Sequence, residues 1–176
     1  MANEMISYLQ QLEILAFFSG YPLIYAIVAY LKSTATSKPT IKNSAFNLLP
    51  FEYATIGLLY VALQIKNLYP DYSIKHLSSE IQIPFFVCWA LSSLVFLTPF
   101  FNKKPIVSLL HSLVFFYLII RNFYLQLISI EPDKNVLTNL RRVYSDSLLL
   151  NATIFIVLLI IYYGARFLKQ KSASLH

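Results

Sequence analysis

The residues of this sequence that could do chemistry are polar side chains set within long apolar stretches. They are Glu52, Ser108, His111, Arg121, Asn122, Gln126 and Ser129. A histidine titrates near neutrality, so a carboxylate–imidazole pair of Glu52 and His111 would be able to relay a proton. The structural alternative is a hydrogen bond between them that joins two membrane helices. Both interpretations require the two side chains to face the protein interior, because ionisable groups are costly in lipid.

Five of these polar side chains share one stripe of a predicted helix. They are Ser108, His111, Asn122, Gln126 and Ser129. At about 100° per residue, they fall within about 60° of one another around the helix axis. Such a stripe is expected to face other helices, where it would form interhelical hydrogen bonds, worth about 0.6 kcal/mol each, or line a polar pathway. The sequence leaves both uses open.

Arg121 lies beside the stripe, about 80° away by the same geometry. An arginine at the centre of a span costs roughly 2.5–3.5 kcal/mol on insertion scales, so it needs an anionic partner or access to water. Glu13 and Asp146 are the candidate ion-pair partners, since both are predicted at a similar depth. A site for an anion or substrate is the alternative, and snorkelling of the side chain toward the headgroups is a third.

Motifs of known enzyme classes are absent from the sequence. There is no HExxH pair, no acidic pair suited to Mg²⁺, no GxSxG elbow and no glycine-rich phosphate loop. Cys88 is the single cysteine and has no partner for a disulfide or a metal site. Ser92 and Ser93 lack a base nearby in the sequence, which leaves a distant base such as His111 open. We therefore expect no catalytic residue, cofactor or metal.

Five apolar stretches must position these residues. They cover residues 14–31, 48–65, 83–101, 105–130 and 148–168. A helix of about 20 mainly apolar residues crosses roughly 30 Å of hydrocarbon, and helices let such runs satisfy their backbone in lipid. The chain is 57% hydrophobic and 12% charged, against about 25% charged in soluble domains. The sequence therefore predicts an all-α polytopic membrane bundle that forms a single domain over residues 1–176.

Lysines and arginines are unequally divided between the two predicted sides of the membrane. Eight flank one side: Lys32, Lys38, Lys42, Lys103, Lys104, Arg166, Lys169 and Lys171. Five flank the other: Lys66, Lys75, Lys134, Arg141 and Arg142. Because positive residues favour the cytoplasmic side, we expect the N-terminus outside and the C-terminus in the cytoplasm. The charges are scattered over loops, so direct nucleic-acid binding is not expected.

Two local features modify the five-span outline. Gly20, Tyr21 and Pro22 interrupt the hydrogen-bond ladder of the first span, so a kink is expected there. Residues 133–146 carry an apolar stripe, and Asp133 is suited to cap a helix. This segment is either a short interfacial helix or a helical extension of the last span.

In its size, five-span layout and richness in Ile, Phe, Tyr and Lys, the chain resembles the small multi-pass membrane accessory proteins of RNA-targeting type VI-B CRISPR loci. The resemblance covers the whole chain as architecture and composition, and it transfers no site residue. It implies a regulator or membrane effector of a bacterial defence nuclease, and with it a location in a bacterial inner (plasma) membrane.

The expected function is that of a non-catalytic accessory or regulatory subunit. Its partners would be the lipid bilayer and either another membrane protein or further copies of the chain. One alternative is a small channel or transporter that uses the polar face of the fourth span. The other is an intramembrane lipid-modifying enzyme built around His111.

Overall fold

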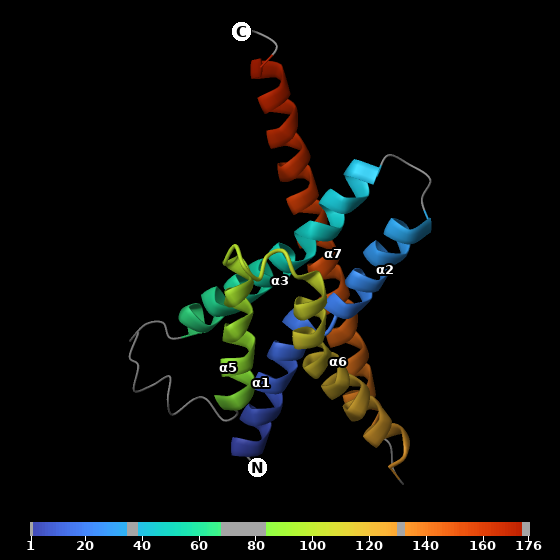
Figure 1. The fold of residues 1–176 in the computed structure, drawn as a ribbon. Coiled ribbons are helices and arrows are strands. Elements are labelled where there is room, and N and C mark those ends of the chain that lie inside the picture. The colour runs from blue at the N-terminus through green and yellow to red at the C-terminus, as the bar shows by residue number, and fades with distance from the viewer. Residues whose placement is uncertain (1, 35–38, 68–83, 130–132, 174–176) are drawn as a thin grey trace.

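The computed structural model describes residues 2–34, 39–67, 84–129 and 133–173. These residues are helical apart from short turns, and none of them forms a strand, which confirms the all-helical prediction. The elements are α1 (Ala2–Phe18), α2 (Tyr21–Thr34), α3 (Pro39–Asn67), α5 (Pro84–Ser92), the 3₁₀ helix η1 (Ser93–Leu97), α6 (Pro105–Leu127) and α7 (Lys134–Ala173) (Figure 1). Outside the described residues lie Lys38, Lys75 and the predicted span ends at residues 83 and 130.

Four helical segments are apolar enough and long enough to cross a membrane. They are Tyr8–Thr34, Ala45–Asn67, Pro105–Leu127 and Lys134–Lys171. The first combines α1 and α2, and the other three belong to α3, α6 and α7. The described helices are therefore compatible with the predicted multi-pass membrane protein.

The predicted span 83–101 is shorter in the structure. Its helical part is α5 with η1, Pro84–Leu97, and the two rise about 24 Å together, against roughly 30 Å of hydrocarbon. The helix ends at Leu97, and the backbone of the following Thr98 is extended. Pro99 follows and has no N–H with which to continue the ladder.

The first membrane segment is broken at Gly20, where the expected kink is found. α1 ends two residues before Gly20, and α2 begins directly after it. The Gly20 carbonyl accepts a hydrogen bond from the N–H of Ile24 over 3.4 Å and so starts α2. Pro22, in the first turn of α2, has no N–H to continue the ladder of α1. The break therefore lets one apolar segment change direction inside the bundle.

Residues 133–146 lie at the start of one continuous helix and do not form a separate element. α7 runs from Lys134 to Ala173 over 40 residues, which is the second of the two predicted arrangements. The Asp133 carboxylate accepts a hydrogen bond from the N–H of Asn135 over 2.8 Å and caps the start of the helix. The C-terminal half of α7 extends beyond the other helices (Figure 1).

The core of the bundle is aromatic. Phe18 and Phe115 stack with their ring centroids 4.8 Å apart. Phe18 also meets the rings of Tyr53 and Tyr60 edge-on, each at 5.7 Å. All four side chains are buried, and together they join α1, α3 and α6.

The helix ends alternate between the two ends of the bundle (Figure 1). The starts of α1 and α7 and the end of α6 lie at one end. The ends of α2 and α7 and the starts of α3 and α6 lie at the other. Many large apolar side chains remain exposed along α2, α3, α6 and α7, and extensive apolar exposure of this kind marks contact with lipid or with another protein.

Candidate functional site

His111 lies at the centre of a cluster of hydrogen bonds and ring contacts. Its Nδ1 is 2.8 Å from the Tyr53 hydroxyl, and its Nε2 is 2.6 Å from the Ser92 hydroxyl. The Trp89 ring stacks on the imidazole with 4.7 Å between centroids, and the indole N–H donates to the His111 carbonyl over 3.0 Å. We call Tyr53, Trp89, Ser92 and His111 the histidine cluster. It joins α3, α5 and α6.

The hydrogen bonds of the histidine cluster fit a neutral imidazole. The Ser92 hydroxyl lies 2.6 Å from the Trp89 carbonyl as well as 2.6 Å from Nε2, and it has one proton to give. When Ser92 donates to Trp89, Nε2–H donates to Ser92 and Nδ1 accepts from Tyr53. In the opposite tautomer Ser92 donates to Nε2, which is how a serine nucleophile pairs with its base. Either tautomer satisfies both ring nitrogens.

Glu52 does not form the expected hydrogen bond with His111, and Tyr53 takes its place. The Glu52 side chain is fully buried, with 0% exposure, and neither carboxylate oxygen has a hydrogen-bond partner among the described residues. The reason is helix geometry, because consecutive side chains on α3 point about 100° apart and only one of them can face the imidazole. A buried carboxyl without a partner is rare and requires an explanation.

Ser108 forms a second interhelical contact beside the histidine cluster. Its hydroxyl lies 2.7 Å from the Tyr21 hydroxyl and donates to the Pro105 carbonyl over 2.8 Å. Tyr21 is therefore the donor in the contact between the two hydroxyls, since Ser108 has used its proton. The ring centroids of Tyr21 and Tyr53 are 4.6 Å apart. The two hydroxyl contacts are thus neighbours in the core.

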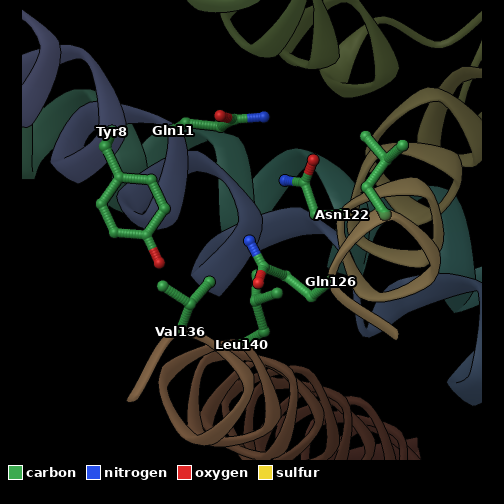
Figure 2. Close-up of a pocket in the computed structure, with 7 residues that line it drawn as sticks. Tyr8, Gln11, Asn122, Gln126, Val136 and Leu140 are labelled. Atoms are coloured by element: carbon green, nitrogen blue, oxygen red, sulfur yellow. The ribbon is translucent and has the colours of Figure 1, made fainter. Parts of the chain in front are cut away.

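Asn122 and Gln126 lie toward the other end of the α6 stripe and line a pocket of about 140 Å³. The pocket, which we call the amide pocket, is lined by Tyr8, Gln11, Asn122, Leu125, Gln126, Val136 and Leu140. Figure 2 shows the amides of Gln11, Asn122 and Gln126 around one shared space. The Tyr8 hydroxyl is shielded from solvent and has no hydrogen-bond partner in the described part of the chain. Ser129, the last residue of the stripe, is half-buried and donates to a carbonyl in α6 over 2.9 Å.

Arg121 does not form the predicted ion pair. Its side chain is exposed, because it lies off the buried stripe of α6. Within the described residues, neither candidate acid is its partner. Glu13 accepts a hydrogen bond from the Gln64 amide over 3.3 Å. Asp146 lies on an exposed face of α7, 3.9 Å from Arg142 one helical turn away.

Ser147 and Asn151 of α7 hold the break between α1 and α2, a role that the apolar pattern did not predict. The Gly20 N–H donates to the Ser147 hydroxyl over 2.9 Å. The Asn151 amide donates to a carbonyl in the last turn of α1, also over 2.9 Å. The two residues are four positions apart on α7, so the stripe rule that selected the polar face of α6 would have found them as well.

No group of three or more histidine, cysteine, aspartate or glutamate side chains that could hold a metal ion occurs among the described residues. No protein-family model, curated protein or solved structure matches the chain. Three features of the described structure are candidates for a functional role: the histidine cluster, the buried Glu52 and the amide pocket.

Proposed function

We propose that this chain is a multi-pass membrane protein that acts by helix association, as a non-catalytic accessory or regulatory subunit. The observation that carries the proposal is the apolar half of α7 that stands outside the bundle. The candidate span Lys134–Lys171 has a mean hydropathy of 2.2, and only 17% of its apolar stretch is buried. The corresponding buried share for Tyr8–Thr34 is 50%. α7 therefore has most of its apolar surface free for contacts outside the chain.

The free half of α7 has a site suited to a second helix. Its exposed apolar side chains include Ile156, Val157, Ile160, Ile161, Phe167 and Leu168. Gly164 lies among them, and apart from its chain neighbours and the nearby backbone of α7, no atom of the described structure would lie within 4 Å of a Cβ there. Small residues let the backbones of two membrane helices approach closely. This surface is therefore suited to bind a helix of a partner protein or α7 of a second copy of the chain.

For the topology we propose five membrane segments in a bacterial plasma membrane. The N-terminus would lie outside the cell and the C-terminus in the cytoplasm. α5 and η1 would be the short third segment, since local bilayer thinning accommodates short spans at modest cost. The start of α1 and the end of α7 lie at opposite ends of the bundle in Figure 1, which supports an odd number of crossings. The excess of Lys and Arg supports the orientation. The resemblance to type VI-B accessory proteins supports a bacterial defence nuclease as the regulated system.

Disulfide cross-linking in membranes tests association through α7. In a Cys88→Ser background, a single cysteine replaces Ile160 on the free half of α7 or, as a matched control, Leu110 on α6. The two positions are similarly exposed, at 66% and 61%. We expect oxidation to give a cross-linked dimer from Ile160→Cys and none from Leu110→Cys. Equal cross-linking at both positions, or a monomer mass after extraction from the native membrane, would contradict the proposal.

A small channel is the second candidate, and Glu52 is the observation that favours it. A carboxyl that is fully buried with both oxygens unpartnered is costly in a structural role. Ionisable groups placed inside a membrane often mark a path for protons or ions. Flux into liposomes that is lost in Glu52→Gln would favour the channel. Unchanged flux in Glu52→Gln, His111→Ala and Arg121→Leu would exclude it.

A further inference from the structure

The amide pocket gathers four polar side chains that the protein itself leaves unpaired. Within the described residues, the side-chain amides of Gln11, Asn122 and Gln126 form no hydrogen bond, and the Tyr8 hydroxyl has no partner. For a group shielded from water, the lack of a partner costs about 1–3 kcal/mol. Only the Tyr8 hydroxyl is shielded in this way, and the three half-buried amides beside it offer further donors and acceptors. A ligand in this space would give the Tyr8 hydroxyl the partner that it lacks among the described residues.

The size of the amide pocket limits that ligand. Its volume of about 140 Å³ is close to that of engineered cavities of roughly 150 Å³ that hold benzene, so the pocket accommodates about six non-hydrogen atoms. Its walls come from three helices, with Tyr8 on α1, Gln126 on α6 and Leu140 on α7 (Figure 2). The ligand is therefore a small molecule or the tip of a larger one.

The chemistry of the lining selects an uncharged ligand. A primary amide carries a carbonyl acceptor and two N–H donors, and a hydroxyl group both donates and accepts. Neighbouring hydroxyls of a polyol therefore match the amides of Asn122 and Gln126. None of the residues that line the pocket is charged, and the adjacent Arg121 is exposed. A phosphate or carboxylate in the pocket would lack the cation that usually binds it.

The position of the amide pocket brings it close to lipid. It lies at the end of the bundle where α1 and α7 begin and α6 ends (Figure 1). In the proposed topology this end meets the outer headgroups. Leu125, which lines the pocket, is 46% exposed on the surface of α6. A lipid can therefore place its headgroup among the amides and its acyl chains beside Leu125.

We propose that the amide pocket binds a small uncharged polyol of about six non-hydrogen atoms, the size of glycerol. Asn122 and Gln126 hold its hydroxyl groups from α6, and Gln11 and Tyr8 hold them from α1. The polyol is either the terminal glycerol of a lipid headgroup or a free molecule. Only the lipid source rests on the proposed topology, and the site itself is independent of association through α7.

Lipid retention by the full-length purified chain, measured by native mass spectrometry, tests the proposal. The probes are dioleoyl phosphatidylglycerol and dioleoyl phosphatidylethanol, which share charge and acyl chains but differ in the diol. We expect about tenfold stronger binding of the glycerol lipid, because the pocket amides lose their partners in the other lipid. Equal retention of both lipids together with binding of free glycerol would assign the site to a soluble polyol. Equal retention without glycerol binding would overturn the proposal.

Variants of the amide pocket test whether the preference for the glycerol lipid arises in the pocket. Asn122→Leu and Gln126→Leu should bind the two lipids equally, whereas Asn139→Leu, which removes an exposed amide of α7 outside the pocket, should keep the preference. Thermal unfolding without lipid checks that each variant is folded. If Gln126→Leu fails to fold, Gln11→Leu makes the same test from α1. A preference that survives in every folded pocket variant would overturn the proposal, whatever the cross-linking at Ile160 shows.

Discussion

The main-chain N–H of Gly20 donates a hydrogen bond to the Ser147 hydroxyl over 2.9 Å, although the two residues are 127 positions apart in the sequence. A Cβ atom at Gly20 would lie 2.7 Å from the Ser147 carbonyl carbon and 2.8 Å from the Leu148 nitrogen. The backbones of the first membrane segment and α7 therefore touch at this point. Asn151, one turn further along α7, donates to the Phe17 carbonyl over 2.9 Å. Polar groups freed by the helix break are thus satisfied by α7.

Replacing Gly20 by alanine is expected to destabilise the bundle strongly. The added Cβ would collide with main-chain atoms of α7 that no side-chain rotation can move, and overpacking costs typically about 1–3 kcal/mol. Gly164→Ala is the matched control, because its Cβ would lie in open space and alanine favours a helix by roughly 0.5–1 kcal/mol over glycine. Thermal unfolding in detergent should show a lower midpoint for Gly20→Ala alone. Equal midpoints would contradict the backbone contact.

A double-mutant cycle between Tyr53 and His111 should show coupling, and one between Glu52 and His111 should show none. The Tyr53 hydroxyl lies 2.8 Å from the imidazole, and hydrogen bonds between membrane helices couple by about 0.6 kcal/mol on average. The cycle combines Tyr53→Phe or Glu52→Gln with His111→Ala and measures the free energy of unfolding. A larger coupling free energy for Glu52 than for Tyr53 would contradict this structure and favour a carboxylate–imidazole pair between Glu52 and His111.

Glu52→Leu is expected to stabilise the protein. The two buried carboxylate oxygens have no partner, so a leucine of similar size removes a desolvation cost of about 1–3 kcal/mol and adds apolar contacts. Gln64→Leu on the same helix is the control, since it removes the hydrogen bond to Glu13 and should not raise the midpoint. A lower unfolding midpoint for Glu52→Leu would show that the carboxyl has a bound partner, and it would favour the channel.

Local chemistry made several features predictable from the sequence. Long apolar runs predict helices because lipid requires internally satisfied backbones. The break near Gly20 followed from Pro22, which has no N–H to offer. Helical periodicity placed Ser108, Asn122 and Gln126 on one face of α6, and in the structure that face holds the buried Ser108 and the amide pocket.

The partners of these residues could not be read from the sequence. Whether Glu52 or Tyr53 meets His111 depends on a rotation of α3 by one residue, about 100°, and only the packing of several helices decides it. Tyr8 and Tyr53 also count as apolar in a hydropathy pattern, although each carries a polar tip that needs a partner when buried. For Arg121, the depth of a residue in the membrane selects candidate acidic partners. That depth does not say which way the arginine side chain points.

Ser92 is not expected to act as a nucleophile, although it lies 2.6 Å from Nε2 of His111. Its proton has a second acceptor, the Trp89 carbonyl at 2.6 Å. Nδ1 faces the Tyr53 phenol, whereas serine hydrolases place a carboxylate there to orient the imidazole and stabilise its charged form. We therefore expect no covalent adduct, by intact mass, after the reconstituted protein is incubated with a fluorophosphonate.

Two variants, Ser92→Ala and His111→Ala, show whether an observed adduct lies on Ser92 and depends on the histidine. An adduct that persists in Ser92→Ala lies on another residue and leaves the expectation intact. An adduct that is lost in Ser92→Ala and also in a folded His111→Ala would contradict it, because dependence on the histidine is what general-base activation of a serine produces. That outcome would make an intramembrane lipid-modifying enzyme the leading function and place its reaction at the exposed Ser92, the last residue of α5.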